Sequence, residues 1–226
     1  MRKIILAFGF LSLLTGCGGS GNHNNNGNND AGQPVTYNLR VLEGSSISMS
    51  LQGTYINDTI TGSSIIHPSG SKNQNGLTID ITEHILSLNA NITDSEKTQK
   101  SYFGYSQGGL YSVEEEQTIC TLPNTVLPTP LPTEAQPGYQ SNIIRLDCDN
   151  GETMEVQYKL KKSGANSVEY SITYKRFLEG AAPGYAITTF SDTYTIASDM
   201  NIISYKYQYA MGPISIDLSS TTISVN

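Results

Sequence analysis

Apolar and polar side chains alternate with a period of two along most of this chain, a pattern typical of β-strands that bury one face. The pattern is most regular between residues 143 and 177, where Asn150-Gly151 and residues 163–166 have turn composition. These turns divide the region into three strands of an antiparallel meander. The residues on its shared apolar face are Ile144, Leu146, Cys148, Met154, Val156, Tyr158, Leu160, Val168, Tyr170, Ile172 and Tyr174.

The alternation continues on both sides of this meander, and no segment has the helical periodicity of an amphipathic helix. We therefore predict one all-β domain from Val35 to Asn226, an antiparallel meander of roughly 10–12 strands. Long strand runs with hairpin connections favour a closed barrel over a β-sandwich. Alternating tyrosines such as Tyr205 and Tyr207 are expected to form a core or a cavity wall. Because alternation does not identify the core face, a transmembrane barrel is a further alternative.

The first part of this domain is less regular. The pattern predicts strands over residues 35–41 and 47–55, a turn at Thr61-Gly62 and a polar loop over residues 67–76. Apolar positions then change phase near His84, which predicts a tight turn or a bulge there. We expect His84 to be a solvated turn residue.

The N-terminal residues form a separate unit. Arg2 and Lys3 precede an apolar run over residues 4–14, which is too short for a transmembrane helix and is typical of a signal peptide. The run ends in Leu14-Thr15-Gly16-Cys17, which resembles the lipobox of bacterial lipoproteins. Residues 18–33 are mostly Gly, Ser and Asn, a composition typical of a flexible tether.

This resemblance implies that a diacylglycerol is attached to the thiol of Cys17, that the chain is cut before Cys17, and that the new amino group is acylated. The domains are then a signal peptide over residues 1–16, a lipidated tether over residues 17–34 and the β domain. Gly18 follows the lipidated cysteine, which in lipoproteins sorted as in enteric bacteria implies export to the outer membrane. We expect a cell-envelope protein anchored by its lipid.

The charge balance restricts the partners. The chain has 13 basic and 20 acidic residues, and processing removes Arg2 and Lys3, which leaves a formal net charge of −9. Such a charge argues against nucleic acid, whose phosphates bind basic surfaces. It also argues against attraction to anionic lipid heads, so the acyl chains are the expected membrane attachment.

Cys120 and Cys148 are the remaining thiols once Cys17 is lipidated. In the oxidising envelope we expect them to form a disulfide. The disulfide would close a loop with five prolines, which is unsuitable for an interior strand or helix. Zinc is the competing interpretation, but these two cysteines have no nearby histidine to complete four ligands.

Gly104-Tyr105-Ser106-Gln107-Gly108 matches the G-x-S-x-G motif and resembles the serine segment of cutinase-type α/β-hydrolases. In that family the histidine follows the serine, whereas His23, His67 and His84 all precede Ser106. The chain also lacks the alternating βα units of that fold. We therefore expect a hairpin turn here and no enzyme activity.

Other motifs give no cofactor or metal site. Asp147, Asp149 and Glu152 invite a calcium interpretation, but their spacing does not fit an EF-hand. The run Glu114 to Glu116 is expected to be a solvated turn at the end of a strand.

Three functional hypotheses remain. The first is a non-enzymatic, lipid-anchored envelope protein with a structural or partner-binding role, the partner being another envelope protein. The second is a binder of a small apolar ligand in a barrel cavity. The third is a serine hydrolase acting through Ser106.

Overall fold

A computed structural model of the chain describes residues 36–37, 44–55, 58–90, 95–179 and 185–226. The described residues form twelve strands and no helix. The strands are β1 (Ile47–Tyr55), β2 (Asp58–Gln74), β3 (Leu77–Ala90), β4 (Ser95–Ser106), β5 (Gly109–Glu115), β6 (Thr118–Thr121), β7 (Ile144–Cys148), β8 (Thr153–Lys162), β9 (Ser167–Phe177), β10 (Thr188–Ala197), β11 (Ile202–Met211) and β12 (Ile214–Val225).

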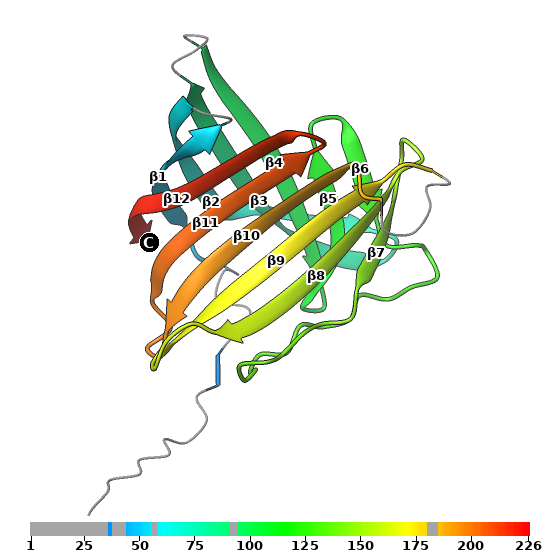
Figure 1. The fold of residues 1–226 in the computed structure, drawn as a ribbon. Helices are drawn as coiled ribbons and strands as arrows, with labels where there is room; N and C mark the ends of the chain where they lie inside the picture. Colours follow the sequence, from blue (N-terminus) through cyan, green and yellow to red (C-terminus); the bar gives the residue numbers. More distant parts are fainter. Residues whose placement is uncertain (1–35, 38–43, 56–57, 91–94, 180–184) are drawn as a thin grey trace, which may run out of the picture. The chain divides into compact units, whose positions relative to one another are not determined.

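The strands form a closed antiparallel barrel in which each strand pairs with its neighbours in the sequence (Figure 1). Closure is made by the first and last strands, from Ile47↔Val225 to Tyr55↔Ile216. The predicted all-β meander and its closed barrel are confirmed.

Alternation along β8, β9 and β10 separates an apolar interior from a polar exterior. Cross-strand register aligns Tyr158 with Ile172 and Tyr170 with Tyr194, all of them buried. The intervening residues point outward and include Glu155, Lys159, Lys161, Glu169 and Lys175. A transmembrane barrel would instead present an apolar band on its outer surface. Among the described residues, no helix is long and apolar enough to cross a membrane.

Connections between antiparallel strands alternate between the two ends of the barrel. One end carries residues 116–117, 149–152 and 212–213, and we call it the mouth. The opposite end carries residues 75–76, 107–108 and 163–166, and we call it the base. The segment that enters β1 also lies at the base, where the backbones of Ser46 and Asn226 exchange hydrogen bonds of 3.2 and 2.8 Å.

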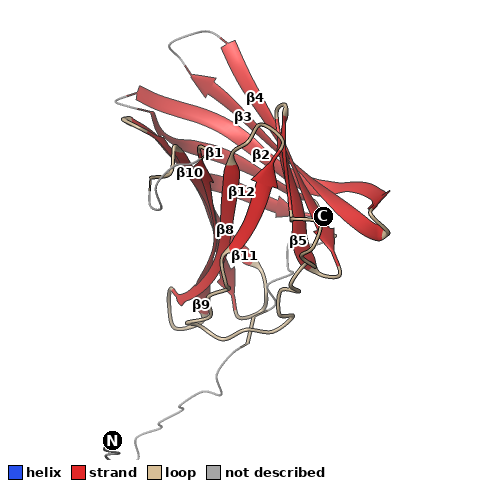
Figure 2. Cartoon of the chain, turned by 90° about the vertical axis from the view of Figure 1, so that its right-hand side faces the viewer, coloured by secondary structure: helices blue, strands red, loops and turns tan. Residues whose placement is uncertain are grey.

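The proline-rich segment between β6 and β7 closes the base. Leu131 is buried and donates a backbone hydrogen bond to Gly108 (2.8 Å), and Ala135 exchanges two backbone bonds with Tyr37 (2.7 and 2.9 Å). The segment lies so close to β5 that a side chain at Gly109 would collide with the carbonyl of Thr129. Figure 2 shows the loops gathered at this end. The predicted irregular loop between Cys120 and Cys148 is thus confirmed, and it covers the base of the barrel.

The predicted turn at Thr61-Gly62 and the predicted polar loop over residues 67–76 are wrong, because β2 continues through Gln74. Pairing of β2 with β3 is interrupted only by a bulge between Pro68 and Ser71. The far end of this hairpin is largely solvent-exposed, so its strands carry polar residues and have the composition of a loop. The predicted strand over residues 35–41 falls mostly outside the described residues.

The phase change in β3 does not mark a turn, since β3 runs unbroken from Leu77 to Ala90. Ile79 packs against the bare backbone of Gly104, where an added Cβ would lie 2.8 Å from the Ile79 side chain. Beyond this point the even-numbered residues, including His84 and Leu86, are buried. The buried apolar residues of β3 therefore lie on its odd-numbered face in the first half of the strand and on its even-numbered face in the second half. The bulge that accompanies this change lies in the partner strand, β2.

Candidate ligand-binding interior

The interior of the barrel holds a small chamber of about 40 Å³ near its centre. Six aromatic side chains line it: Phe103, Tyr105, Tyr158, Tyr170, Tyr174 and Tyr194. Leu131 from the base segment also lines this chamber, together with Asp192 and His84. The base segment thus contributes to the chamber, and aromatic side chains form most of its walls.

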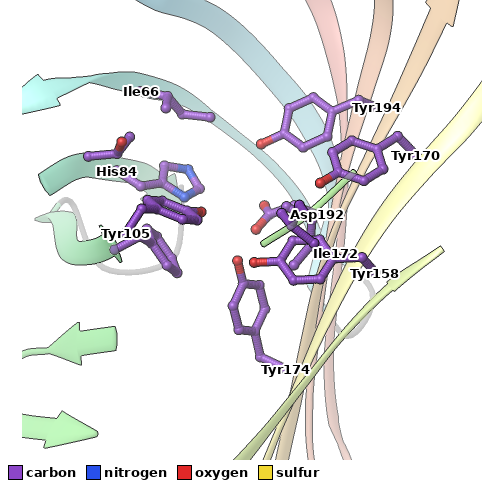
Figure 3. A pocket seen from close by; sticks show the side chains of 12 residues that line it. Ile66, His84, Tyr105, Tyr158, Tyr170, Ile172, Tyr174, Asp192 and Tyr194 are labelled. Carbon is purple, nitrogen blue, oxygen red and sulfur yellow. The ribbon is translucent and has the colours of Figure 1, made fainter. Parts of the chain in front are cut away.

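The tyrosines of β8, β9 and β10 direct their hydroxyl groups toward the centre of the chamber (Figure 3). Their rings contact one another across the strands, with centroids 6.2 Å apart for Tyr158 and Tyr170 and 6.3 Å apart for Tyr170 and Tyr194. Tyr194 continues the series to Tyr205 at 5.0 Å. This ladder follows from the strand period of two, which places alternate tyrosines on one face. It confirms the prediction of a tyrosine-rich core and cavity wall.

Asp192 places a carboxyl group among these rings. Its exposed fraction is only 3%, and Tyr205 donates a hydrogen bond to its Oδ1 atom at 2.5 Å. Burial raises the pKa of Asp192, while His84 and the hydrogen bond from Tyr205 act in the opposite direction. A carboxylate in this position is costly unless a cation or further donors compensate it.

His84 lies on the opposite wall and is 8% exposed, so the predicted solvated turn is wrong. Its Nε2 atom is 2.7 Å from the Oγ atom of Ser64. Burial lowers the pKa of His84, although the nearby Asp192 opposes this effect. Burial therefore favours the uncharged form of this imidazole more than water favours that form in a free histidine.

Two further hollows lie between this chamber and the mouth. A narrow neck of about 10 Å³ shares His84, Phe103 and Asp192 with the chamber. It shares other residues, including Glu115 and Tyr207, with an outer hollow of about 290 Å³. The outer hollow is exposed to solvent at Glu116 and at Met211, which is 43% exposed.

The outer hollow has an apolar wall and a charged wall. The apolar wall consists of Leu86, Leu88, Phe190, Tyr209, Met211 and Ile216. On the charged wall, Arg176 lies 2.6 Å from Glu152 and 3.6 Å from Glu115. Burial raises the pKa of Glu115 to about 7, despite the opposing effects of Arg176 and of a hydrogen bond from Ser101. The prediction of a solvated turn at residues 114–116 thus fails for Glu115, which points into the barrel.

The predicted disulfide between Cys120 and Cys148 is present. It joins a directly paired position of β6 and β7, two short strands that share two residue pairs in total. Cys148 shares the apolar face of Leu146, as the alternation predicts. The bridge therefore lies at the shortest ladder of the barrel and not in the interior chamber.

Ser106 is the last residue of β4 and directly precedes the predicted hairpin turn. Its Oγ atom donates a hydrogen bond to the Thr78 carbonyl at 2.8 Å, and its exposed fraction is 2%. The turn residues Gln107 and Gly108 have φ angles of 53° and 74°, typical of a tight hairpin connection. His67 lies elsewhere and pairs with Glu83 at 3.1 Å. Cys17 and His23 fall outside the described residues.

Ser64 and His84 form a serine–histidine contact that the sequence did not reveal. A hydroxyl hydrogen-bonded to an imidazole is the first requirement of an activated nucleophile. Ser64 is completely shielded, however, at 0% exposure, and it is not among the residues that line the inner chamber. We interpret the bond as one that orients His84. Within the part of the chain that the structure covers, no group of three or more His, Cys, Asp or Glu residues could hold a metal ion.

No family model, no curated protein and no solved structure matches this chain.

Proposed function

We propose that this protein is a lipid-anchored cell-envelope barrel that binds a small, partly apolar molecule in its interior. The observation that carries the proposal is the series of hollows from the mouth to the aromatic chamber, in which successive hollows share lining residues. The base segment supports a single direction of access because Leu131 lines the inner end. The ligand hypothesis therefore ranks above the partner-binding one.

The dimensions favour a small ligand. Pockets for drug-sized ligands generally span about 300–1,000 Å³, and the outer hollow reaches about 290 Å³. Its apolar wall supplies the hydrophobic contact that drives such binding. The shielding of Ser64 and Ser106 supports a binding role over a hydrolytic one.

The test uses the mature domain without its lipid and the uncharged dye N-phenyl-1-naphthylamine, whose fluorescence rises in apolar surroundings. We expect saturable binding that Leu88→Lys weakens strongly, because Leu88 lies on the apolar wall of the outer hollow. Ile203→Lys is the matched control, since Ile203 is 58% exposed and lines none of the three hollows. Absence of saturable binding, or equal loss in both variants, would contradict the proposal.

A further inference from the structure

We propose that the ligand carries a primary ammonium group, bound by Asp192 within the tyrosine chamber, and that its apolar part extends toward the mouth. This inference rests on the proposed function and specifies the chemical class of the ligand. It draws on the charge, the aromatic lining and the size of the three hollows.

Carboxyl groups line the whole path from mouth to chamber. Glu115 and Glu116 line the outer hollow, Glu115 and Asp192 line the neck, and Asp192 lines the chamber. The basic residues on this path are Arg176 and His84. Arg176 is already engaged by Glu152 and Glu115, and burial favours the neutral form of His84. A cation therefore meets an acidic side chain at each step of the path.

The chamber offers an ammonium group two kinds of contact. Asp192 and the converging tyrosine hydroxyls are hydrogen-bond acceptors, and an ammonium group donates three hydrogen bonds. The faces of aromatic rings also attract cations, most strongly where water is excluded. A neutral hydroxyl group would gain only part of these contacts.

The chamber has room for a small head group. Its volume of about 40 Å³ exceeds the roughly 10–15 Å³ that one water molecule requires. An ammonium group therefore fits. The neck of about 10 Å³ admits only a narrow chain, and the outer hollow beyond it presents Leu86, Leu88 and Ile216 to an apolar tail.

The experiment compares three probes that share one alkyl chain and differ in the charge of the head group: hexylammonium, 1-hexanol and hexanoate. Calorimetric titration of the mature wild-type domain at pH 8 measures each dissociation constant. We expect hexylammonium to bind roughly tenfold or more tightly than 1-hexanol, the range expected for a hydrogen bond to a charged group, and hexanoate to bind most weakly.

Asp192→Asn keeps the shape of the side chain and removes its charge, so it should reduce hexylammonium affinity to that of 1-hexanol. Asp217→Asn is the control, because Asp217 is an exposed acid on β12 that lines none of the hollows. If Asp192→Asn does not fold, the comparison of the three probes on the wild-type domain is the test of the ammonium inference.

The outcomes separate the two proposals. Equal affinity for the three probes, or tightest binding of hexanoate, overturns the ammonium inference even when the uncharged dye binds. Failure of both the dye and every alkyl probe to bind overturns the proposed function as well.

Discussion

Asp192, Glu115 and His84 are buried ionisable groups in an interior that is otherwise apolar and aromatic. Each of them loses hydration on folding, and replacement of buried ionic groups by apolar residues of similar size is often neutral or stabilising. Their shared position along the neck supports a role in binding and not in folding.

The sequence contained a signal that Asp192 is buried, although we drew no conclusion from it in the sequence analysis. Asp192 occupies the inward phase of β10 between Phe190 and Tyr194, so an acid stands where the pattern requires an apolar residue. Glu115 lacked even this signal, because two further glutamates flank it and together they have the composition of a solvated turn. Only the register of β5 with β4, which pairs Glu115 with Ser101, determines that it points inward.

Glu115 also predicts a pH dependence of stability. Its pKa rises from 4.5 in the unfolded chain to about 7 in the barrel because of burial, so the folded state binds the proton more tightly. The contribution of Glu115 to stability is then fully present below pH 4.5 and is lost as the pH rises to about 7. At one pKa unit per 1.36 kcal/mol the loss is about 3 kcal/mol.

Urea unfolding at pH 5 and pH 7.5 measures this loss. We expect Glu115→Gln to remove much of the decline in unfolding free energy between these pH values. Asp192, Glu116 and Arg176 act on Glu115 as well, and they remain in the variant. Glu114→Gln is the matched control, because Glu114 lies next to Glu115 and lines neither the chamber, nor the neck, nor the outer hollow. An unchanged pH profile in Glu115→Gln would contradict the assigned pKa.

At the scale of elements, regular alternation predicted the strands and turns most accurately where one face of a strand is buried along its whole length. The meander of β7, β8 and β9 has the turns and the inward residues that the sequence predicts. The hairpin of β2 and β3 does not have the turns that the sequence predicts. Part of it carries polar residues on both exposed faces, and part of it buries Ile79 on the outer side. Such burial depends on contacts with β4, which no local pattern encodes.

The ladder between β6 and β7 is the structural weak point of the barrel. Its two residue pairs, Cys120↔Cys148 and Thr121↔Asp147, compare with ten pairs between β8 and β9. Hydrogen bonds between Ile119 and Asp149, at 3.0 and 3.1 Å, extend it only slightly. The disulfide thus keeps the barrel closed where backbone pairing contributes least.

Replacement of both Cys120 and Cys148 by serine should lower the free energy of unfolding by about 3–4 kcal/mol, the chain-entropy value for a ring of this length. Because the ladder is short, we also expect amide hydrogen exchange to accelerate first in residues 118–121 and 144–148. The unfolding midpoint and exchange mass spectrometry measure the two effects. Uniform acceleration throughout the barrel would show that the bridge stabilises the whole domain and not this ladder. Two freely alkylated thiols in the purified native protein would refute the bridge itself.

At the scale of the whole chain, the two ends of the barrel differ, because the chain enters β1 at one end and the hollows reach solvent at the other. The preceding segment joins β1 at the base, which also holds the C-terminal residue Asn226. The hollows reach solvent at the opposite end, near Glu116 and Met211. The chain thus enters β1 at the base, whereas the proposed binding path opens at the mouth.

The anchor itself leads to the last prediction, that Cys17→Ser releases the protein from membranes. A chain cut before Cys17 would have a formal net charge of −9, which opposes binding to anionic lipid heads, and strands β8 and β9 present charged residues outward. The acyl chains are then the attachment that remains. Fractionation of cells that express the full chain measures the distribution between membrane and soluble fractions.

The double serine variant of Cys120 and Cys148 is the control, because it also removes thiols but retains the segment Leu14-Thr15-Gly16-Cys17, which resembles a lipobox. It should stay in the membrane fraction, with its mass increased by the acyl chains. A Cys17→Ser protein that sediments with membranes, and that high salt and carbonate do not release, would show that the barrel reaches the bilayer by another route.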